Sequence, residues 1–254
     1  MADWRPVEHG ESGAGVFRSA DGSRYAKVVG PVGVDALAAE RDRVSWAHHR
    51  GIPAPAVLDW GATDDGGAYL ITSAVQGVPA DRLPESALRA AWPSILAAVR
   101  ALHALPVGNC PYRRDLDTML ALARAVVAAD AVNPDFLRDE DRAVPATELL
   151  HRVEREAGLR RQQETGDAVV CHGDLCLPNI LVDAAVEACT GFIDLGRLGV
   201  ADRHADLALL SANTADTFPG FADEAAAALA AGYPRGLDDA RVDFYLRLDP
   251  LTWG

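Results

Sequence analysis

Short apolar runs separated by turn signals fill the first third of the chain. Asp21-Gly22 stands between two such runs, and Asp64-Asp65-Gly66-Gly67 stands between two more. Aspartate and glycine flanked by apolar runs are typical of a β-hairpin, because they tolerate the backbone conformation of a tight turn. The pattern predicts strands at residues 16–18, 24–29, 56–60 and 68–73, with a helix from residue 34 to about residue 50 between the two hairpins.

A helical period replaces this pattern from about residue 83 onward. Apolar residues recur at three- and four-residue steps, which places them on one helix face, at Leu88, Trp92, Ile95, Val99 and Leu102. Pro93 is expected to kink or restart this helix. Further helices are predicted at residues 116–127, 145–156, 223–231 and 237–248. We therefore expect a small mixed lobe of residues 1–75 and a larger, mainly helical lobe of residues 76–254.

The composition fits a folded protein of this size and limits the classes of molecule that we expect it to bind. With 254 residues, 49% of them hydrophobic, the chain can build a sizeable core. It has no apolar run long enough to span a bilayer, and its start lacks the basic and apolar regions of a signal peptide, so we expect a cytoplasmic protein without membrane contact. A net charge of −13 argues against nucleic acid as a partner and is compatible with a cationic one.

The cysteines show no paired C-x-x-C spacing. In a chain without an export signal they are expected to be reduced thiols, not a disulfide framework or a zinc site. They are Cys110, Cys171, Cys176 and Cys189.

The chemistry indicated by residues 169–196 is phosphoryl transfer. Asp174 follows an apolar run, Asn179 comes five residues later, and Asp194 closes another apolar run before a leucine and a glycine. A carboxylate can accept the proton of an attacking hydroxyl, and carboxylate and amide oxygens are ligands for Mg²⁺. If residues 180–182 and 190–193 pair as antiparallel strands, Asn179 and Asp194 lie at the same end of the hairpin. The alternative is that each is only a turn residue beside a strand.

Two features of the small lobe fit the binding of a nucleotide. The loop Gly10-Glu11-Ser12-Gly13-Ala14-Gly15 precedes a strand, as expected if its backbone N–H groups covered phosphates, although an ordinary glycine-rich turn has the same pattern. Lys27 lies inside an apolar strand, where the simplest role is on the solvent face of an edge strand. Glu40, however, shares a helix face with Leu37 and Val44. A carboxylate on an apolar face is costly unless paired, which predicts a Lys27–Glu40 ion pair that holds the lysine against phosphates.

These residues also carry a family resemblance. The loop, Lys27, Glu40, His172-Gly173-Asp174, Asn179 and Asp194-Leu195-Gly196 resemble, in this order, the kinase-like aminoglycoside O-phosphotransferases. The resemblance covers essentially the whole chain, and residues 132–137, 171–178 and 245–254 look like the streptomycin 3″-phosphotransferase branch. It implies an α+β, bilobal protein-kinase-like fold with a small β-rich nucleotide-binding N-lobe and a larger, mainly helical C-lobe for catalysis and substrate binding.

The resemblance also implies the reaction and its residues. It implies an ATP- and Mg²⁺-dependent kinase that phosphorylates an aminoglycoside, most closely the 3″-hydroxyl of streptomycin, and so confers antibiotic resistance. The implied roles are catalytic base for Asp174, Mg²⁺ ligands for Asn179 and Asp194, phosphate contacts for Ser12 and Lys27, orientation of Lys27 for Glu40, and adenine contacts for backbone groups of Ser73 and Val75.

Carboxylates outside this core are candidate contacts for a cationic drug. Guanidinium groups, as on streptomycin, pair with carboxylates through two parallel hydrogen bonds. The candidates are Asp135, Asp139, Glu140 and Asp141 in what is otherwise a solvated loop, Asp206, and Asp249 near the C-terminus. Asp206 has a second possible role, as an anchor for the loop that carries Asp174. His172 and His103 are expected to be structural, His103 as a satisfied core histidine.

Other functions remain open at this point. The same fold could act on another aminoglycoside or on a choline- or homoserine-like metabolite. The complete set of expected catalytic residues argues against a catalytically inactive nucleotide-binding module. The lack of a long activation loop after Asp194 argues against a protein kinase. The sequence predicts neither the oligomeric state nor a preference between ATP and GTP.

Overall fold

The computed structural model describes residues 4–7 and 14–253, which fall into two compact units. The first unit comprises residues 1–91 and 178–197, and the second comprises residues 92–177 and 198–254. This division differs from the expected single boundary near residue 75. The reason is that residues 178–197 form a hairpin that pairs with strand β6 (Val78–Pro79) and so belongs to the first unit.

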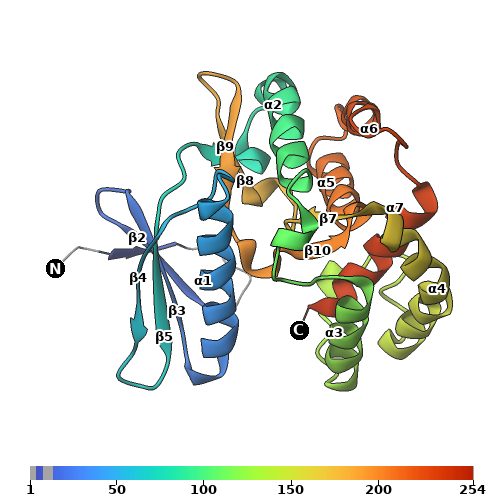
Figure 1. Ribbon diagram of the computed structural model, residues 1–254, viewed down its shortest axis with the longest axis horizontal. Coiled ribbons are helices and arrows are strands. Elements are labelled where there is room, and N and C mark those ends of the chain that lie inside the picture. Colours follow the sequence, from blue (N-terminus) through green and yellow to red (C-terminus); the bar gives the residue numbers. More distant parts are fainter. Residues whose placement is uncertain (1–3, 8–13, 254) are drawn as a thin grey trace. The chain divides into compact units, whose positions relative to one another are not determined.

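The first unit is built on an antiparallel sheet with the strand order β1-β2-β3-β5-β4. Helix α1 (Val34–His49) packs against β5 and β4 (Figure 1), where Leu37 meets Ala68 and Leu70 in a small core. The four predicted strands and the predicted helix are confirmed to within two residues at each end. The strands are β1 (Trp4–Pro6), β2 (Gly15–Ser19), β3 (Arg24–Val29), β4 (Val57–Ala62) and β5 (Ala68–Ser73).

A second, smaller sheet completes this unit. Its strand order is β6-β8-β9, with β8 at Ile180–Asp183 and β9 at Ala188–Phe192. Ile180 pairs with Phe192 across the antiparallel β8–β9 ladder. The predicted hairpin is therefore confirmed, and its open end carries the residues just before β8 and just after β9.

The second unit is mainly helical. A core of buried side chains from α3, α4, α5 and α7 includes Leu120, Val153, Ala208 and Phe244. Strands β7 and β10 form an antiparallel pair in the same unit. The elements are α2 (Glu85–His103), which starts in the first unit, α3 (Leu116–Ala128), α4 (Ala146–Asp167), β7 (Ala168–Cys171), β10 (Gly199–Asp202), α5 (Arg203–Thr217), α6 (Ala222–Ala231) and α7 (Asp239–Leu248).

Three helix predictions need correction or addition. Helix α2 continues past Pro93, with Leu88, Ile95 and Val99 fully buried along its face. Helix α4 runs 11 residues beyond the predicted end at residue 156, to Asp167, through a polar stretch that gives no apolar period. Helix α5 was not predicted, because most of its first half is buried on every side and a helix without a polar face has no amphipathic signature.

The remaining expectations about the chain as a whole concern thiols and membranes. None of the four cysteines takes part in a disulfide, as expected. Within residues 4–7 and 14–253, no helix combines the length and apolar character needed to cross a bilayer.

Candidate active site

The predicted Lys27–Glu40 ion pair is confirmed in the first unit. Lys27 lies on β3, which is paired on both sides by β2 and β5, so it is not on an edge strand. Its Nζ lies 2.8 Å from Glu40 Oε2 on α1 and 3.6 Å from Asp194 Oδ1. The lysine and glutamate side chains are 20% and 15% exposed. One ammonium group therefore joins two carboxylates from separate parts of the sequence.

Electrostatics keep this lysine charged. Burial favours the neutral amine, but the carboxylates of Asp194 and Glu40 outweigh it and raise the pKa of Lys27. Burial raises the pKa of Glu40, and Lys27 opposes that effect. Lys27 is also the single lysine of the chain, whose other 23 basic side chains are arginines. A compact ammonium in this setting suits a phosphate contact that needs a fixed point charge.

The β8–β9 hairpin brings Asn179 and Asp194 to the same end, as predicted. Ile193 N donates a hydrogen bond to Asn179 O at 3.0 Å, which extends the ladder by one step toward that end. Asp194 has φ of 57°, in the left-handed region that few non-glycine residues adopt. Such a conformation is strained and is often found at functional sites.

The donor chemistry at this end of the hairpin fits Mg²⁺. Asn179 offers an amide oxygen and Asp194 a carboxylate, and both are hard oxygen ligands. The Asp194 side chain is 47% exposed, so a ligand can reach it. Asn179 is largely buried. We retain both as proposed metal ligands.

Asp174 lies in the second unit, in the loop that follows β7. Gly173 adopts φ of 85°, which turns the chain directly after His172. His172 is fully buried, and its Nδ1 accepts a hydrogen bond from Asp174 N at 3.2 Å. This agrees with the expectation that His172 is structural. The half-buried Asp174 carboxylate lies 3.8 Å from the Cys176 thiol.

Asp206 holds the loop of Asp174 in place. Its carboxylate accepts hydrogen bonds from the backbone nitrogens of His172, at 2.7 Å, and Gly173, at 2.8 Å. His103 Nε2 lies 3.1 Å from Asp206 Oδ2. Burial opposes ionisation of Asp206, but the hydrogen bond and charge of His103 outweigh it and lower its pKa.

The proposed contact between Asp206 and substrate is therefore wrong. Asp206 is completely buried, and both of its oxygens are used by the loop and by His103. It is a positioning residue for Asp174, the second role that its sequence allowed. His103 is a satisfied core histidine, as predicted, because its other nitrogen lies 2.8 Å from the Tyr233 hydroxyl.

His103, Cys171 and Asp206 lie close enough together to resemble a metal site. Their ligand atoms are all within 4.8 Å of one another. Burial and the nearby carboxylates of Asp206 and Asp202 raise the pKa of the Cys171 thiol well above its ordinary value, whereas metal ligation needs a thiolate. The Asp206 oxygens are also occupied by backbone donors. This cluster is a structural network.

Two of the candidate drug contacts turn inward. Asp249 is 6% exposed, and its oxygens meet Arg114 and the Trp253 indole nitrogen, both at 3.0 Å. Asp141 is also 6% exposed and lies 3.0 Å from Arg138 Nη2. Both carboxylates therefore stabilise the second unit, and the expectation that they contact substrate is not supported.

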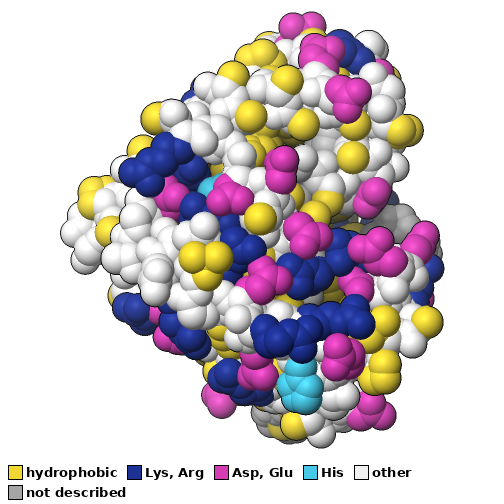
Figure 2. Space-filling view, turned by 90° about the vertical axis from the view of Figure 1, so that its right-hand side faces the viewer, with side chains coloured by type: hydrophobic (Ala, Val, Ile, Leu, Met, Phe, Trp, Pro, Cys, Tyr) yellow, Lys and Arg dark blue, Asp and Glu magenta, His cyan; other side chains and the backbone are white. Residues whose placement is uncertain are grey.

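Three other candidate carboxylates remain open to solvent, on Asp135, Asp139 and Glu140. Asp139 and Glu140 have side chains that are 91% and 71% exposed. Asp139 and Glu140 each form a surface ion pair with an arginine, Asp139 with Arg142 and Glu140 with Arg138. Such intermingling of acidic and basic groups is general on one face of the molecule (Figure 2). Surface ion pairs of this kind contribute little stability, so a cationic ligand can displace the arginine.

The nucleotide contacts implied by the resemblance are only partly described. Ser12 lies outside the described residues. The Ser73 backbone nitrogen donates to Ala56 O at 2.9 Å, so this nitrogen is already used within the sheet. Val75 follows on the segment after β5, and its side chain lies close to Gly191. Both remain proposals.

Several supporting residues carried no signal in the sequence. Asn213 Oδ1 accepts from Leu177 N at 2.8 Å and so holds the chain between Asp174 and Asn179. Glu164 accepts from Leu116 N at 3.0 Å and from Asp202 N at 3.3 Å. Each acts across 36 to 48 residues of sequence, and a lone polar residue in a helix is ordinary. Sequence spacing therefore could not find them.

The fold and these side chains define the class of protein. They are those of a kinase-type phosphotransferase. The β-sheet lobe carries a lysine–glutamate ion pair, the hairpin carries an asparagine and an aspartate at one end, and a hydrogen-bonded loop carries a further aspartate. The comparisons agree. Residues 3–242 match the phosphotransferase enzyme family, so the chain belongs to that family, and its similar proteins are aminoglycoside phosphotransferases.

The similarity to individual proteins extends over nearly the whole chain. A streptomycin 3″-kinase from Streptomyces griseus is 54% identical over 99% of this chain and 93% of its own length. An aminoglycoside 3′-phosphotransferase from Streptomyces fradiae is 42% identical over 82% of this chain and 78% of its own. The structure of APH(3″)-Id from Streptomyces rimosus in complex with ADP and streptomycin covers 100% of this chain and 94% of its own, with 54% identity and a TM-score of 0.93.

Proposed function

We propose that this enzyme transfers the γ-phosphoryl group of ATP to the 3″-hydroxyl of streptomycin and thereby confers resistance to that antibiotic. The observation that supports this most is the 54% identity, over nearly the full length, to a streptomycin 3″-kinase. The neighbouring structure with ADP and streptomycin agrees with both substrates. Use of a nucleotide follows from the same comparison.

The chain's own residues supply the steps of the reaction. The Asp174 carboxylate accepts the proton of the attacking hydroxyl, whose oxygen forms the new bond to the γ-phosphorus while the bond to the β,γ-bridging oxygen breaks and ADP leaves. Asp206 keeps the loop of Asp174 in one conformation through the two backbone hydrogen bonds. Lys27, oriented by Glu40, holds the phosphates of ATP.

A divalent cation completes the proposed machinery. Asn179 and Asp194 would hold Mg²⁺, which supplies positive charge to the phosphates as negative charge develops on them. The Asp194 carboxylate brings charge to that interaction, and the Asn179 amide brings only a dipole. Loss of Asp194 should therefore be the more damaging of the two.

The exposed carboxylates are the remaining candidates for drug recognition. Asp139 and Glu140 offer acceptors to guanidinium groups, which bind carboxylates in a fixed two-bond geometry. Such a site should accept drugs that carry only amines poorly. The net charge of −13 favours the approach of any polycation.

A panel assay tests this proposal. ADP release is measured by a coupled assay with streptomycin, kanamycin and neomycin as acceptors, with Mg²⁺ and with EDTA. We expect turnover with streptomycin, little with the other two, and none in EDTA. Turnover of kanamycin equal to that of streptomycin would favour the 3′-phosphotransferase activity named for the Streptomyces fradiae relative. Turnover unaffected by EDTA would contradict the metal ligands.

A further inference from the structure

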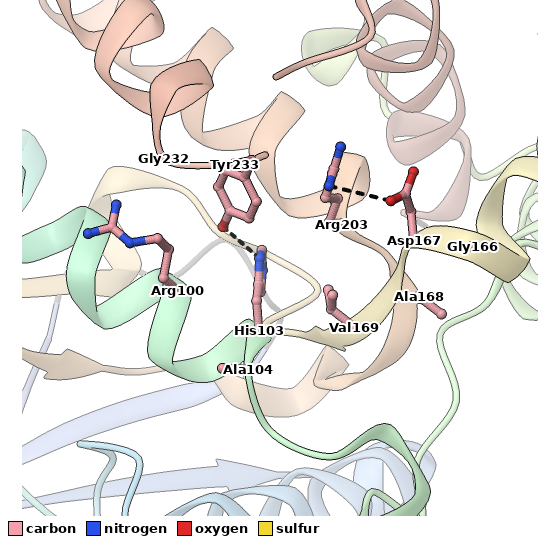
Figure 3. A pocket seen from close by; sticks show the side chains of 10 residues that line it. All are labelled: Arg100, His103, Ala104, Gly166, Asp167, Ala168, Val169, Arg203, Gly232 and Tyr233. Carbon is pink, nitrogen blue, oxygen red and sulfur yellow. Dashed lines mark hydrogen bonds and ion pairs between the residues drawn. The ribbon is translucent and has the colours of Figure 1, made fainter. Parts of the chain in front are cut away.

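The second unit contains a pocket that the proposed reaction does not use. Its volume is about 330 Å³, within the range of small-molecule sites. It is lined by the end of α2, the junction of α4 with β7, the start of α5 and the residues after α6 (Figure 3). None of the residues proposed to bind ATP, metal or drug lines it.

The lining carries an excess of positive charge. Arg100 and Arg203 line the pocket, with Asp167 as the acidic lining residue. Asp167 is already shared by Arg203 at 3.4 Å, Arg235 at 3.4 Å and Arg241 at 2.6 Å. Burial opposes ionisation of Asp167, but these arginines lower its pKa and keep it charged. In a chain of net charge −13, a pocket rich in arginine points to an anionic ligand.

Arg203 has hydrogen-bonding capacity that the protein does not satisfy. It is 8% exposed, and its terminal nitrogens meet Asp167 and the Gly236 carbonyl. Its Nε is buried without a hydrogen-bond partner in the described part of the chain. Because this nitrogen is enclosed, Arg203 acts on an anion in the pocket as a fixed positive charge and not through Nε.

Arg100 differs from Arg203 in being exposed. No carboxylate of residues 4–7 and 14–253 lies within ion-pair distance of it. Figure 3 shows Arg100 and Arg203 on opposite sides of His103 and Tyr233. An anion in the pocket would therefore pair with the flexible Arg100 side chain, and the fixed charge of Arg203 would attract it from the other side.

The same pocket is connected by hydrogen bonds to the catalytic loop. The Tyr233 hydroxyl and His103 Nδ1 are 2.8 Å apart in its lining. His103 Nε2 continues to Asp206 at 3.1 Å, and Asp206 accepts from the backbone of Gly173, the residue before Asp174. All of these residues belong to the second unit.

We propose that this pocket binds a small organic anion, a carboxylate or a phosphate monoester with a short apolar body, and that binding is transmitted to the catalytic loop through His103 and Asp206. The guanidinium group of Arg100 holds the anionic head, and Arg203 adds a fixed positive charge in the same lining. Ala104 and Val169 give the apolar body a surface.

Binding is tested by calorimetry at fixed ionic strength, with benzoate and phenyl phosphate as probes and benzyl alcohol as the neutral control. Neither ATP nor aminoglycoside is present, so the result is independent of the proposed kinase activity. We expect saturable one-to-one binding of at least one anion and none of the alcohol. The two anions distinguish a carboxylate site from a phosphate site.

Variants assign the binding to this pocket. Arg100→Met should weaken binding about tenfold, the effect of losing one charge-assisted hydrogen bond. Arg155→Met, which removes an exposed arginine of α4 outside the pocket, should change nothing. Ala104→Phe, which fills the pocket without altering charge, should also weaken binding. No saturable binding, or equal affinity in Arg100→Met and the unaltered protein, would overturn the proposed site.

Hydrogen exchange tests the connection to the loop. Bound anion should slow exchange of the His172 and Gly173 amides, because both donate to Asp206. Unchanged exchange in the saturated protein would overturn the transmission while leaving the binding site in place.

Discussion

At the scale of single residues, Lys27 offers a direct chemical test because it is the only lysine in the chain. An ATP analogue that carries an amine-reactive ester should modify Lys27 and, apart from the terminal amine, no other group. The neighbouring carboxylates raise its pKa, so the reaction needs alkaline pH to expose the neutral amine. Peptide mass mapping should show one modified side chain, protected by excess ATP and missing in Lys27→Arg. Modification that ATP does not slow would remove Lys27 from the nucleotide site.

The Lys27–Glu40 ion pair leads to a second prediction. Lys27→Ala should raise the KM for ATP, and Glu40→Ala should have the same effect more mildly by freeing the lysine. Because both changes break one 2.8 Å contact, the double variant should be less than additive, by about 1 kcal/mol in transition-state free energy. The measurement is kcat/KM for ATP in all four proteins. Strict additivity would mean that the pair does not act as a unit.

Asp174 is the proposed catalytic base. Asp174→Asn should lower kcat about 10²-fold or more while ATP binding and thermal stability stay nearly unchanged, because the loop remains tied to Asp206 and only the proton acceptor is lost. Asp216→Asn, an exposed aspartate of α5, is the matched control. Near-normal turnover in Asp174→Asn would exclude it as the base.

At the scale of the elements, sequence pattern predicted short strands bounded by turn residues and helices with one apolar face. The β8–β9 hairpin followed from two apolar runs next to Asn179 and Asp194, and the Lys27–Glu40 pair followed from the cost of a carboxylate on an apolar helix face. Helix α5 did not, because a helix buried on all sides lacks a period. The partners of Asp206 and Asp249 did not either, since they lie as far as 103 and 135 residues away in sequence.

The end of α4 carries a pH-dependent contact. Burial and the nearby Asp115 and Asp202 carboxylates raise the pKa of Glu164 to about 7, although the Leu116 amide opposes them. A carboxyl with a raised folded pKa stabilises the protein below its unfolded pKa, and this contribution is lost as pH rises through about 7.

Glu164→Gln removes that pH dependence and keeps an oxygen acceptor for Leu116 and Asp202. The variant and the unaltered protein should have similar melting temperatures at pH 5. At pH 8 the variant should be more stable by about 1 kcal/mol, since solvent screens a partly exposed group. Thermal unfolding followed by circular dichroism at both pH values is the measurement. A variant that is less stable at pH 8 would show that the charged carboxylate is favourable.

At the scale of the whole molecule, separate observations agree on a phosphotransferase. The two units carry different parts of the proposed machinery, with Lys27, Asn179 and Asp194 in one and Asp174 in the other. The chain belongs to the phosphotransferase enzyme family over residues 3–242, which places all four residues within the matched region. The identity of the phosphate acceptor, by contrast, is inferred from the exposed carboxylates of Asp139 and Glu140 and from the similarity to a streptomycin 3″-kinase.

The position of the phosphate on streptomycin tests the central claim most directly. The purified enzyme is incubated with ATP, Mg²⁺ and streptomycin, and the product is analysed by mass spectrometry and by phosphorus–proton correlation NMR. We expect the addition of one phosphate, on the 3″-oxygen, and little product from Asp174→Asn in the same time. A phosphate on any other streptomycin hydroxyl, or no phosphorylated streptomycin while kanamycin is modified, would contradict it.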